Sequence, residues 1–253
     1  MKKIIKYLLL FIVALTVFLV ATLPVSVVLP WLPKSVPLTI DGAQGTIWNG
    51  RAAQVRYDRL ALGAVSWKIH PVSLLLGRLN ADFRLQGEGL QAKGHVTLKP
   101  DRSLGLADTL VDAEVAKLPL PPQAALVSPA GKINATIRSL SLIDRKVQGA
   151  DADILWNDAQ IRSPTRMALG QLVLNVTGKN GQLNGVLESH KGPLKVKGTI
   201  DLLASGLLKT NIRLAPEPST PREIRDIVPL LGRPDRNGVV TIRQQLRIPG
   251  WPA

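Results

Sequence analysis

The chain has 253 residues, of which 32 are Lys or Arg and 18 are Asp or Glu, so it carries a formal net charge of +14 at pH 7. It contains no Cys, which excludes a disulfide-stapled scaffold, thiol chemistry and every thiolate-ligated metal site. With 45% hydrophobic residues and three widely separated His, the composition is globular and argues against a His-rich metal centre.

The first 34 residues have the pattern of a membrane anchor. Lys2, Lys3 and Lys6 precede an uncharged stretch of 27 residues, from Tyr7 to Pro33. Its first 17 residues, before any proline, would rise about 26 Å as a helix, close to the ~30 Å hydrocarbon core of a bilayer. Because basic residues stay on the cytoplasmic side, we predict a single transmembrane helix with a cytoplasmic N-terminus.

A cleaved signal peptide is the alternative, since it also begins with basic residues and an apolar segment. The apolar run here exceeds the roughly 7 to 15 residues of such a peptide. No small-x-small triplet follows it, because Leu19 lies two residues before Ala21 and Pro24 two residues before Ser26. The uncleaved anchor is favoured, with everything after residue 34 exported. Trp31 then suits the far membrane interface, and packing on the folded domain is its alternative role.

Beyond the anchor, the main signal is two-residue alternation of apolar and polar side chains. Turn formers such as Asn180-Gly181 and Asn237-Gly238 separate the alternating segments. Strands with one apolar face and short turns form antiparallel sheets that bury one side. The sequence therefore predicts a mainly β fold, an elongated, twisted antiparallel sheet or groove. The clearest strands are predicted at 90–98, 131–142, 169–177, 194–202, 207–214 and 239–248.

Two short helices are predicted between strands, and residues 122–127 are a further candidate. Residues 71–76 begin with proline and end at Gly77, as a short helix does. Residues 220–231 begin with Thr220, have Glu223 at the spacing of a capping box and end at Gly232, with Pro229 in the last turn.

The exported part contains an internal repeat. Four short motifs recur in the same order at separations of 104 to 108 residues, which predicts two related β units, 35–140 and 141–253. The first copies are Trp48-Asn49, Leu62-Gly63, Gly77-Arg78-Leu79-Asn80 and Lys93-Gly94, and the second copies are Trp156-Asn157, Leu169-Gly170, Gly181-Gln182-Leu183-Asn184 and Lys197-Gly198.

Catalytic and cofactor motifs are absent from the sequence. Asp151 and Asp153 share one face of a strand, where a paired-carboxylate hydrolase is conceivable, but a solvated strand face is favoured. His70, His95 and His190 are expected at the surface or at a rim. We therefore expect no catalytic, cofactor-binding or metal-binding residue, no cofactor, and a protein that is not an enzyme.

The distribution of positive charge along the chain argues against nucleic acid as a partner. Without the three cytoplasmic Lys, 29 basic and 18 acidic residues leave a net charge of +11 on the exported part. No run of five basic residues and no cluster of aromatic side chains for base stacking is present. A basic surface that meets anionic headgroups or acidic proteins is the better interpretation.

Three motifs after the anchor resemble those of a known family. GTIWNGRA at 45–52, LGAVSW at 62–67 and PVSLLLGRL at 71–79 resemble the type II secretion system protein N family, also called general secretion pathway protein N. The resemblance implies a single-pass inner-membrane component of a Gram-negative machine that exports folded proteins from the periplasm across the outer membrane. Its partners would be other subunits of that system and the inner membrane. A more distant similarity to AsmA-like envelope proteins implies an apolar β-groove that binds or transfers phospholipid.

The motif residues are also candidates for an interaction site. Trp48 followed by Asn49-Gly50 predicts a strand end and a hairpin turn whose residues adopt positive φ. The alternative is that Trp48 and Trp67 belong to a protein-binding surface, where exposed Trp is enriched. The candidate residues are Trp48, Asn49, Gly50, Arg51, Trp67 and Gly77, and the membrane-interface residues are Lys2, Lys3, Lys6 and Trp31.

Overall fold

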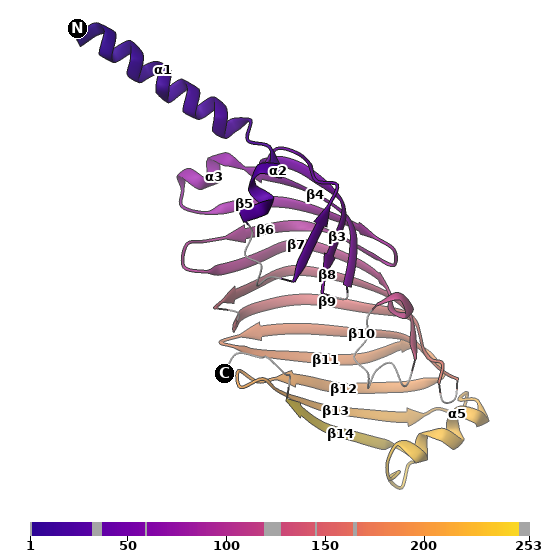
Figure 1. Cartoon of the computed structure of the whole chain (residues 1–253). Coiled ribbons are helices and arrows are strands. Elements are labelled where there is room, and N and C mark those ends of the chain that lie inside the picture. The colour runs from indigo at the N-terminus through magenta and orange to yellow at the C-terminus, as the bar shows by residue number, and fades with distance from the viewer. Residues whose placement is uncertain are drawn as a thin grey trace.

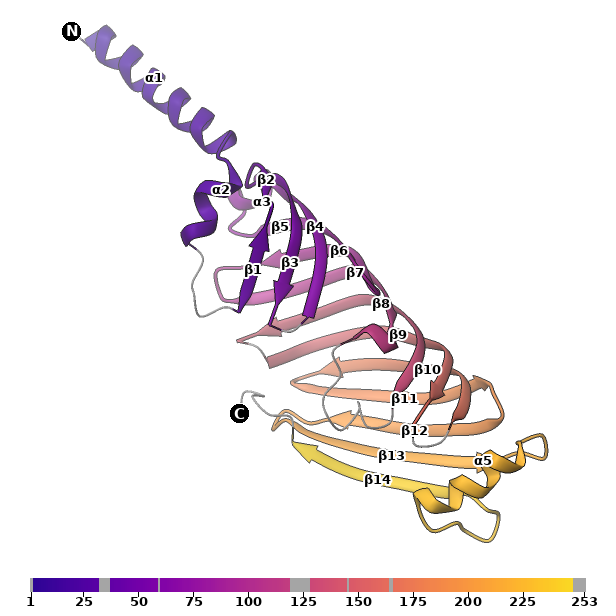
Figure 2. The same cartoon turned by 45° about the vertical axis from the view of Figure 1, so that its right-hand side comes forward.

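The computed structural model describes residues 2–31, 37–58, 60–118, 128–144, 146–163 and 166–247, without the side chains of Lys2, Lys3 and Ile5. A long N-terminal helix leads into one antiparallel sheet in which 14 strands are described (Figure 1). The sheet twists, so that β1 (Leu38–Asp41) and β3 (Asn49–Tyr57) cross in front of later strands in both views (Figures 1 and 2). The predicted fold class, mainly β with few short helices, is confirmed.

The described strands follow the chain order across the sheet, except that β2 pairs only with β3. The other strands are β2 (Gln44–Gly45), β4 (Leu60–His70), β5 (Leu79–Gly87), β6 (Leu90–Leu98), β7 (Ser103–Glu114), β8 (Pro129–Ile143), β9 (Lys146–Ile161), β10 (Met167–Lys179), β11 (Gln182–Lys191), β12 (Leu194–Leu202), β13 (Leu207–Pro216) and β14 (Val240–Arg247).

The described helical elements are short apart from the first, and the helix candidate at 122–127 lies outside the described residues. They are α1 (Lys2–Ala21), α2 (Val25–Val28), η1 (Leu29–Trp31), α3 (Pro71–Leu75), η2 (Val115–Lys117), α5 (Arg222–Ile227) and η3 (Val228–Leu231), where η denotes a 3-10 turn.

The predicted strands and turns agree closely with the observed ones. The segments 90–98 and 194–202 coincide with β6 and β12, and the other four predicted strands differ from theirs by a few residues at most. Asn180 and Gly181 both have positive φ, 53° and 81°, as a two-residue hairpin between β10 and β11 requires. Gly238 also adopts positive φ, in the turn before β14.

Alternation along the strands produces two chemically different faces. In β8, Ile133 and Ile137 are half-buried, whereas Lys132 and Thr136 on the other face are exposed. The register extends both faces across the neighbouring strands. Ile133 pairs with Trp156 and Trp156 with Leu172, while Thr136 pairs with Asp153 and Asp153 with Asn175. One face is therefore a continuous apolar surface and the other is polar.

The tightest core lies at the C-terminal end of the apolar face, where α5 and η3 cover it. Val228 and Val240 are 0% exposed and Leu194 is 1% exposed. They pack with Ile224 and Leu214 in one cluster of buried apolar side chains. Burying each such side chain contributes roughly 1.5–3 kcal/mol, so this cluster closes the end of the sheet.

The capping box predicted for the second helix is wrong. The residue before α5 is Pro221, and no side chain caps the helix. Thr220 is instead 4% exposed, and its Oγ1 accepts a hydrogen bond from the Glu217 amide at 2.7 Å and donates one to the Pro193 carbonyl. The hydroxyl therefore joins the segment before α5 to the residue before β12 and does not cap the helix.

The repeated motifs lie at corresponding places six strands apart. Gly63 in β4 and Gly170 in β10 have φ of 75° and 80°. A Cβ on either would stand 2.4 Å from the Cα of another glycine, Gly87 at the end of β5 and Gly192 just after β11 respectively. The sheet itself runs without a break, and the expected boundary at 140/141 falls inside β8. The division into two units stays a prediction.

The helix α1 stands apart from the sheet, with apolar side chains that are 45–71% exposed from Ile4 to Val20. Among the residues that the structure describes, no helix combines the length and the apolar character needed to cross a membrane.

Substituting Gly170 tests the close approach of its backbone to the Lys191 carbonyl. A Cβ there would lie 1.7 Å from the Lys191 carbonyl oxygen, on a backbone with positive φ. We expect Gly170→Ala to lower the free energy of unfolding by about 3 kcal/mol or more. Gly238→Ala is the matched control, since it has φ of 74° but no atom within 4 Å, and it should cost only about 1 kcal/mol. Urea unfolding of the full chain in detergent, followed by circular dichroism, measures both, and equal losses would contradict the close approach.

Candidate functional site

The end of α1 is joined to the sheet through Trp48. The indole Nε1 of Trp48 donates a hydrogen bond to the Val20 carbonyl at 2.7 Å. The backbone amide of Ile47, the residue before Trp48, donates a second hydrogen bond, to the Leu23 carbonyl at 3.1 Å. Val20 lies in the last turn of α1, where carbonyl groups lack the usual partner four residues on, and its carbonyl accepts a long hydrogen bond from the Leu23 amide at 3.4 Å. The indole supplies such a partner and fixes the helix end against the sheet.

A second indole fixes the same segment from the sheet side. Trp67 in β4 donates from Nε1 to the Ile47 carbonyl at 3.0 Å. The Trp48 carbonyl accepts from the Ile69 amide at 2.7 Å. Gly50 packs under the ring of Trp67, because a Cβ at Gly50 would stand 2.4 Å from its Cζ2 atom. We call Trp48, Trp67, Gly50 and their carbonyl partners the indole junction.

The hairpin turn predicted at Asn49-Gly50 is wrong. Both residues begin β3, where they pair with Lys68 and Trp67, and neither has positive φ. The chain turns just before them, at Thr46–Trp48 between β2 and β3, where the Thr46 amide donates to the Asn49 carbonyl at 3.0 Å. Position 50 requires glycine because the ring of Trp67 lies against it. In the sequence, the resulting Asn-Gly pair looks the same as that of a hairpin turn.

The other motif residues lie near the junction but serve local structure. Arg51 donates from Nε and Nη2 to Oε1 of Gln44, at 3.3 and 2.9 Å, across the β2–β3 pair. Gly77 has φ of 66° in the turn after α3, and its amide donates to the Leu74 carbonyl at 3.0 Å. The backbone amide of Asn49 donates to Thr46 Oγ1 at 3.1 Å. A role for these residues in binding stays a prediction.

The predicted membrane-interface residues are only partly described. Trp31 is 79% exposed at the end of η1, so its side chain does not pack on the described domain. Lys6 is exposed on α1, and the side chains of Lys2 and Lys3 lie outside the described residues. Placement of all four at a membrane interface stays a prediction.

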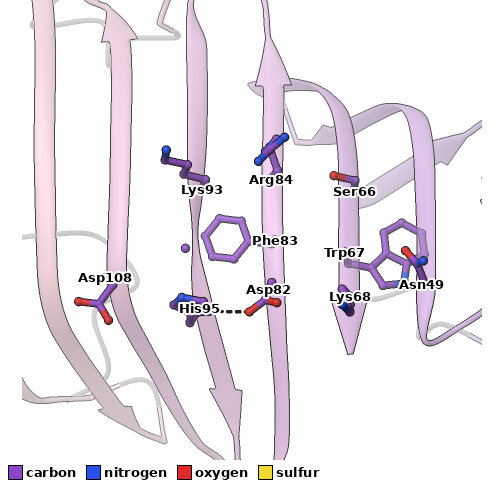
Figure 3. Close-up of a pocket in the computed structure, with 11 residues that line it drawn as sticks. Asn49, Ser66, Trp67, Lys68, Asp82, Phe83, Arg84, Lys93, His95 and Asp108 are labelled. Atoms are coloured by element: carbon purple, nitrogen blue, oxygen red, sulfur yellow. Dashed lines mark hydrogen bonds and ion pairs between the residues drawn. The ribbon is translucent and has the colours of Figure 1, made fainter. Parts of the chain in front are cut away.

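A hollow of about 380 Å³ opens beside the indole junction and is lined by side chains from β3 to β7 (Figure 3). Within it, Asp82 of β5 lies between two histidines from the neighbouring strands. Its Oδ2 is 3.0 Å from His70 Nε2 and its Oδ1 is 2.5 Å from His95 Nδ1. Partial burial raises the pKa of Asp82, but the hydrogen bonds from His95 and His70 outweigh it and lower that pKa overall.

These histidines are exposed, as the sequence indicated, but their shared carboxylate was not foreseen. The only usable signal was the alternation in 79–87 and 90–98, because it places Asp82 and His95 opposite each other once the hairpin register is known. His190 lies in β11, not in the turn-like segment expected for it.

The carboxylates of Asp151 and Asp153 do not form a free catalytic pair. Both bond to the guanidinium of Arg138 on β8, whose Nε lies 2.8 Å from Asp151 Oδ2. Those hydrogen bonds lower the pKa of both carboxyl groups and raise that of Arg138. Within the described residues, no group of three or more His, Asp or Glu side chains could hold a metal ion. The pair is a structural ion bridge across two strands.

The family of the chain follows from comparison with known proteins. Residues 37–243, which include Trp48, Gly50, Trp67 and most of the sheet, match the family model described as type II secretion system (T2SS), protein N. The chain belongs to this family.

Two relatives support the T2SS protein N assignment over nearly the full length. A type II secretion system protein N from Vibrio cholerae is 29% identical over 261 residues, covering 97% of this chain and 99% of the relative. A type II secretion system protein N from Aeromonas hydrophila is 25% identical over 248 residues, covering 94% and 96%. A comparison with solved structures gives no significant match.

Removing one indole N–H at a time tests the junction. Trp48→Phe should increase amide hydrogen exchange in peptides that cover the end of α1 and α2, because it removes the Val20 hydrogen bond. Trp67→Phe should lower the free energy of unfolding by about 1–2 kcal/mol.

The matched control is Trp156→Phe, which removes an equivalent bond, from Nε1 to the Ala130 carbonyl, far from α1. It should leave exchange at the α1 end unchanged. Equal exchange in Trp48→Phe and Trp156→Phe would show that Trp48 does not hold the helix.

The position of Asp82 predicts a pH-dependent contribution to stability. Its folded-state pKa is below the unfolded value of about 3.9, so the carboxylate stabilises the fold above that pH and the effect is lost as pH falls through the folded pKa. Asp82→Asn should therefore destabilise the protein at pH 7, by an amount that shrinks toward about pH 3. Urea midpoints at both pH values measure this, and in a His70→Ala/His95→Ala background the difference should disappear. A pH-independent effect would contradict the bonding.

Proposed function

We propose that the chain is a periplasmic component of the type II secretion system, anchored in the inner membrane by α1, that supports export of folded proteins through contacts with other subunits. The observation that carries the proposal is the indole junction. It fixes an apolar helix to a sheet with a solvated polar face, which is the form expected of a tethered scaffold.

The character of α1 supports the anchor. The helix has 20 residues, equivalent to about 30 Å of rise, and the apolar side chains of Leu10, Phe11 and Phe18 are more than 60% exposed. Such a surface is stable in lipid and unfavourable in water. The Lys residues at its start support a cytoplasmic N-terminus, with the sheet in the periplasm.

The edges of the sheet support binding to other subunits. β14 has an outer edge that pairs with none of the described strands, and its last five residues are exposed. An unpaired edge offers backbone N–H and C=O groups to a strand of another protein. Arg243 and Arg247 beside this edge favour an acidic partner.

A lipid-handling module is the second candidate, and one observation favours it. The apolar face extends across the strands between the indole junction and the C-terminal core, and residues such as Leu140, Leu174 and Val176 on it remain only half-buried. A face of this kind could hold acyl chains along the sheet. Phospholipid that co-purifies with the protein in native mass spectra would favour this function.

Gene deletion tests the first function. In a strain that expresses the gene, we expect deletion to lower the amount of type II substrates in the medium and to leave them in the periplasm. A plasmid copy should restore export, whereas Trp48→Ala/Trp67→Ala should not. Normal export of all substrates after deletion would contradict the proposal.

In-cell photo-crosslinking separates the two functions. A crosslinker at Ser139 reports on the polar face and one at Leu140, the next residue, on the apolar face of β8. Secretion subunits captured from Ser139 or from β14 support the scaffold. Phospholipid captured from Leu140, with no subunit from either face, favours the lipid module.

A further inference from the structure

The loop between β4 and β5 presents an unusual group of exposed apolar side chains. Val72, Leu75 and Leu76 are 71%, 86% and 67% exposed, and Leu74 is 42% exposed. We call residues 71–78 the leucine loop. A surface in water rarely holds so many neighbouring large apolar groups without a partner, so this loop has the character of a contact surface.

The leucine loop is held in a defined conformation. Ser73 is 7% exposed, and its Oγ donates to the His70 carbonyl at 2.6 Å and accepts from the Asn80 amide at 3.1 Å. The Arg78 amide donates to the Ser73 carbonyl at 3.1 Å. The buried Ser73 thus closes the loop at its base, and the apolar side chains are directed outward by the fold.

The loop lies at the end of the sheet where α1 leaves it. Ile69, two residues before the loop, donates to the Trp48 carbonyl, and the indole of Trp48 bonds to Val20 of α1. Both views show α3 beside α2 at this end of the sheet (Figures 1 and 2). One residue, Trp48, therefore links the end of α1 to the strand that carries the loop.

The positive charge of Arg78, beside the loop, suits an anionic bilayer surface. Arg78 is exposed immediately after the apolar group, where its long side chain can reach headgroup phosphates while the leucines lie deeper. Trp31, 79% exposed at the end of η1, is a second side chain suited to headgroup depth.

We infer that the leucine loop inserts into the periplasmic leaflet of the same membrane that holds α1, with Val72, Leu75 and Leu76 among the acyl chains. The occupant of this apolar surface is the lipid bilayer, because the loop lies at the end of the sheet where the exposed apolar helix leaves it, and Trp48 links the two. This inference rests on the proposed anchoring by α1. Insertion at a second point would fix the tilt of the sheet relative to the membrane.

The absence of Cys makes a depth measurement straightforward. The full chain carrying Leu75→Cys is labelled with an environment-sensitive fluorophore and reconstituted in vesicles of phosphatidylethanolamine and phosphatidylglycerol. Emission is compared with and without lipids that carry a nitroxide just below the headgroup. Leu10→Cys in α1 reports on the anchor. Leu230→Cys is the matched control, since Leu230 is an equally exposed leucine, 82%, in the short turn η3 at the opposite end of the sheet.

We expect a blue-shifted spectrum and roughly twofold or greater nitroxide quenching for the label at position 75, and neither for the label at position 230. Quenching at position 10 without quenching at position 75 would overturn the inference and leave the anchor intact. No quenching at either position would overturn both. Protection of position 75 from aqueous iodide without lipid quenching, and only at high protein density, would place a second copy on the loop and would also overturn the inference.

Discussion

The antiparallel ladder from β1 to β14 is the constraint on which the other features of this protein depend. Because side chains alternate along every strand, the register determines which residues share a face. It places Ile133, Trp156 and Leu172 on one side and Thr136, Asp153 and Asn175 on the other. A slip of one residue in a single pair would exchange the faces, and both the apolar surface and the ion bridge of Arg138 would be lost.

The indole junction fixes the orientation of the sheet relative to α1. Trp67 reaches the Ile47 carbonyl only because the β3–β4 register sets Gly50 opposite it, which lets the ring lie flat against the backbone. Trp48 then bonds to α1 on one side and to β4 on the other. In the proposed setting, any tilt of α1 in the membrane is passed to the sheet through these few hydrogen bonds. A scaffold that presents a surface to other secretion subunits needs such a fixed orientation.

Much of the fold could be predicted because its signals are local. Alternation located strands such as β6 and β12, and Asn180-Gly181 located a hairpin, since each depends on a few adjacent residues. Errors arose where a residue serves a distant contact. Gly50 accommodates the ring of Trp67, and Thr220 bonds to Pro193, so neither performs the local role that its neighbours in sequence suggest. The contact of Asp82 with both His70 and His95 depends on the register of three strands, which alternation alone does not set.

The central claim is that α1 holds the sheet on the periplasmic side of the inner membrane, and cysteine labelling tests it most directly. Single cysteines at Lys6, in the first turns of α1, and at Ser139, on the polar face of β8, are introduced into the Cys-free chain. A membrane-impermeant maleimide is then applied to spheroplasts. The account predicts labelling of position 139 in intact spheroplasts and of position 6 only after lysis. Labelling of position 6 in intact spheroplasts, or protection of position 139, would contradict it.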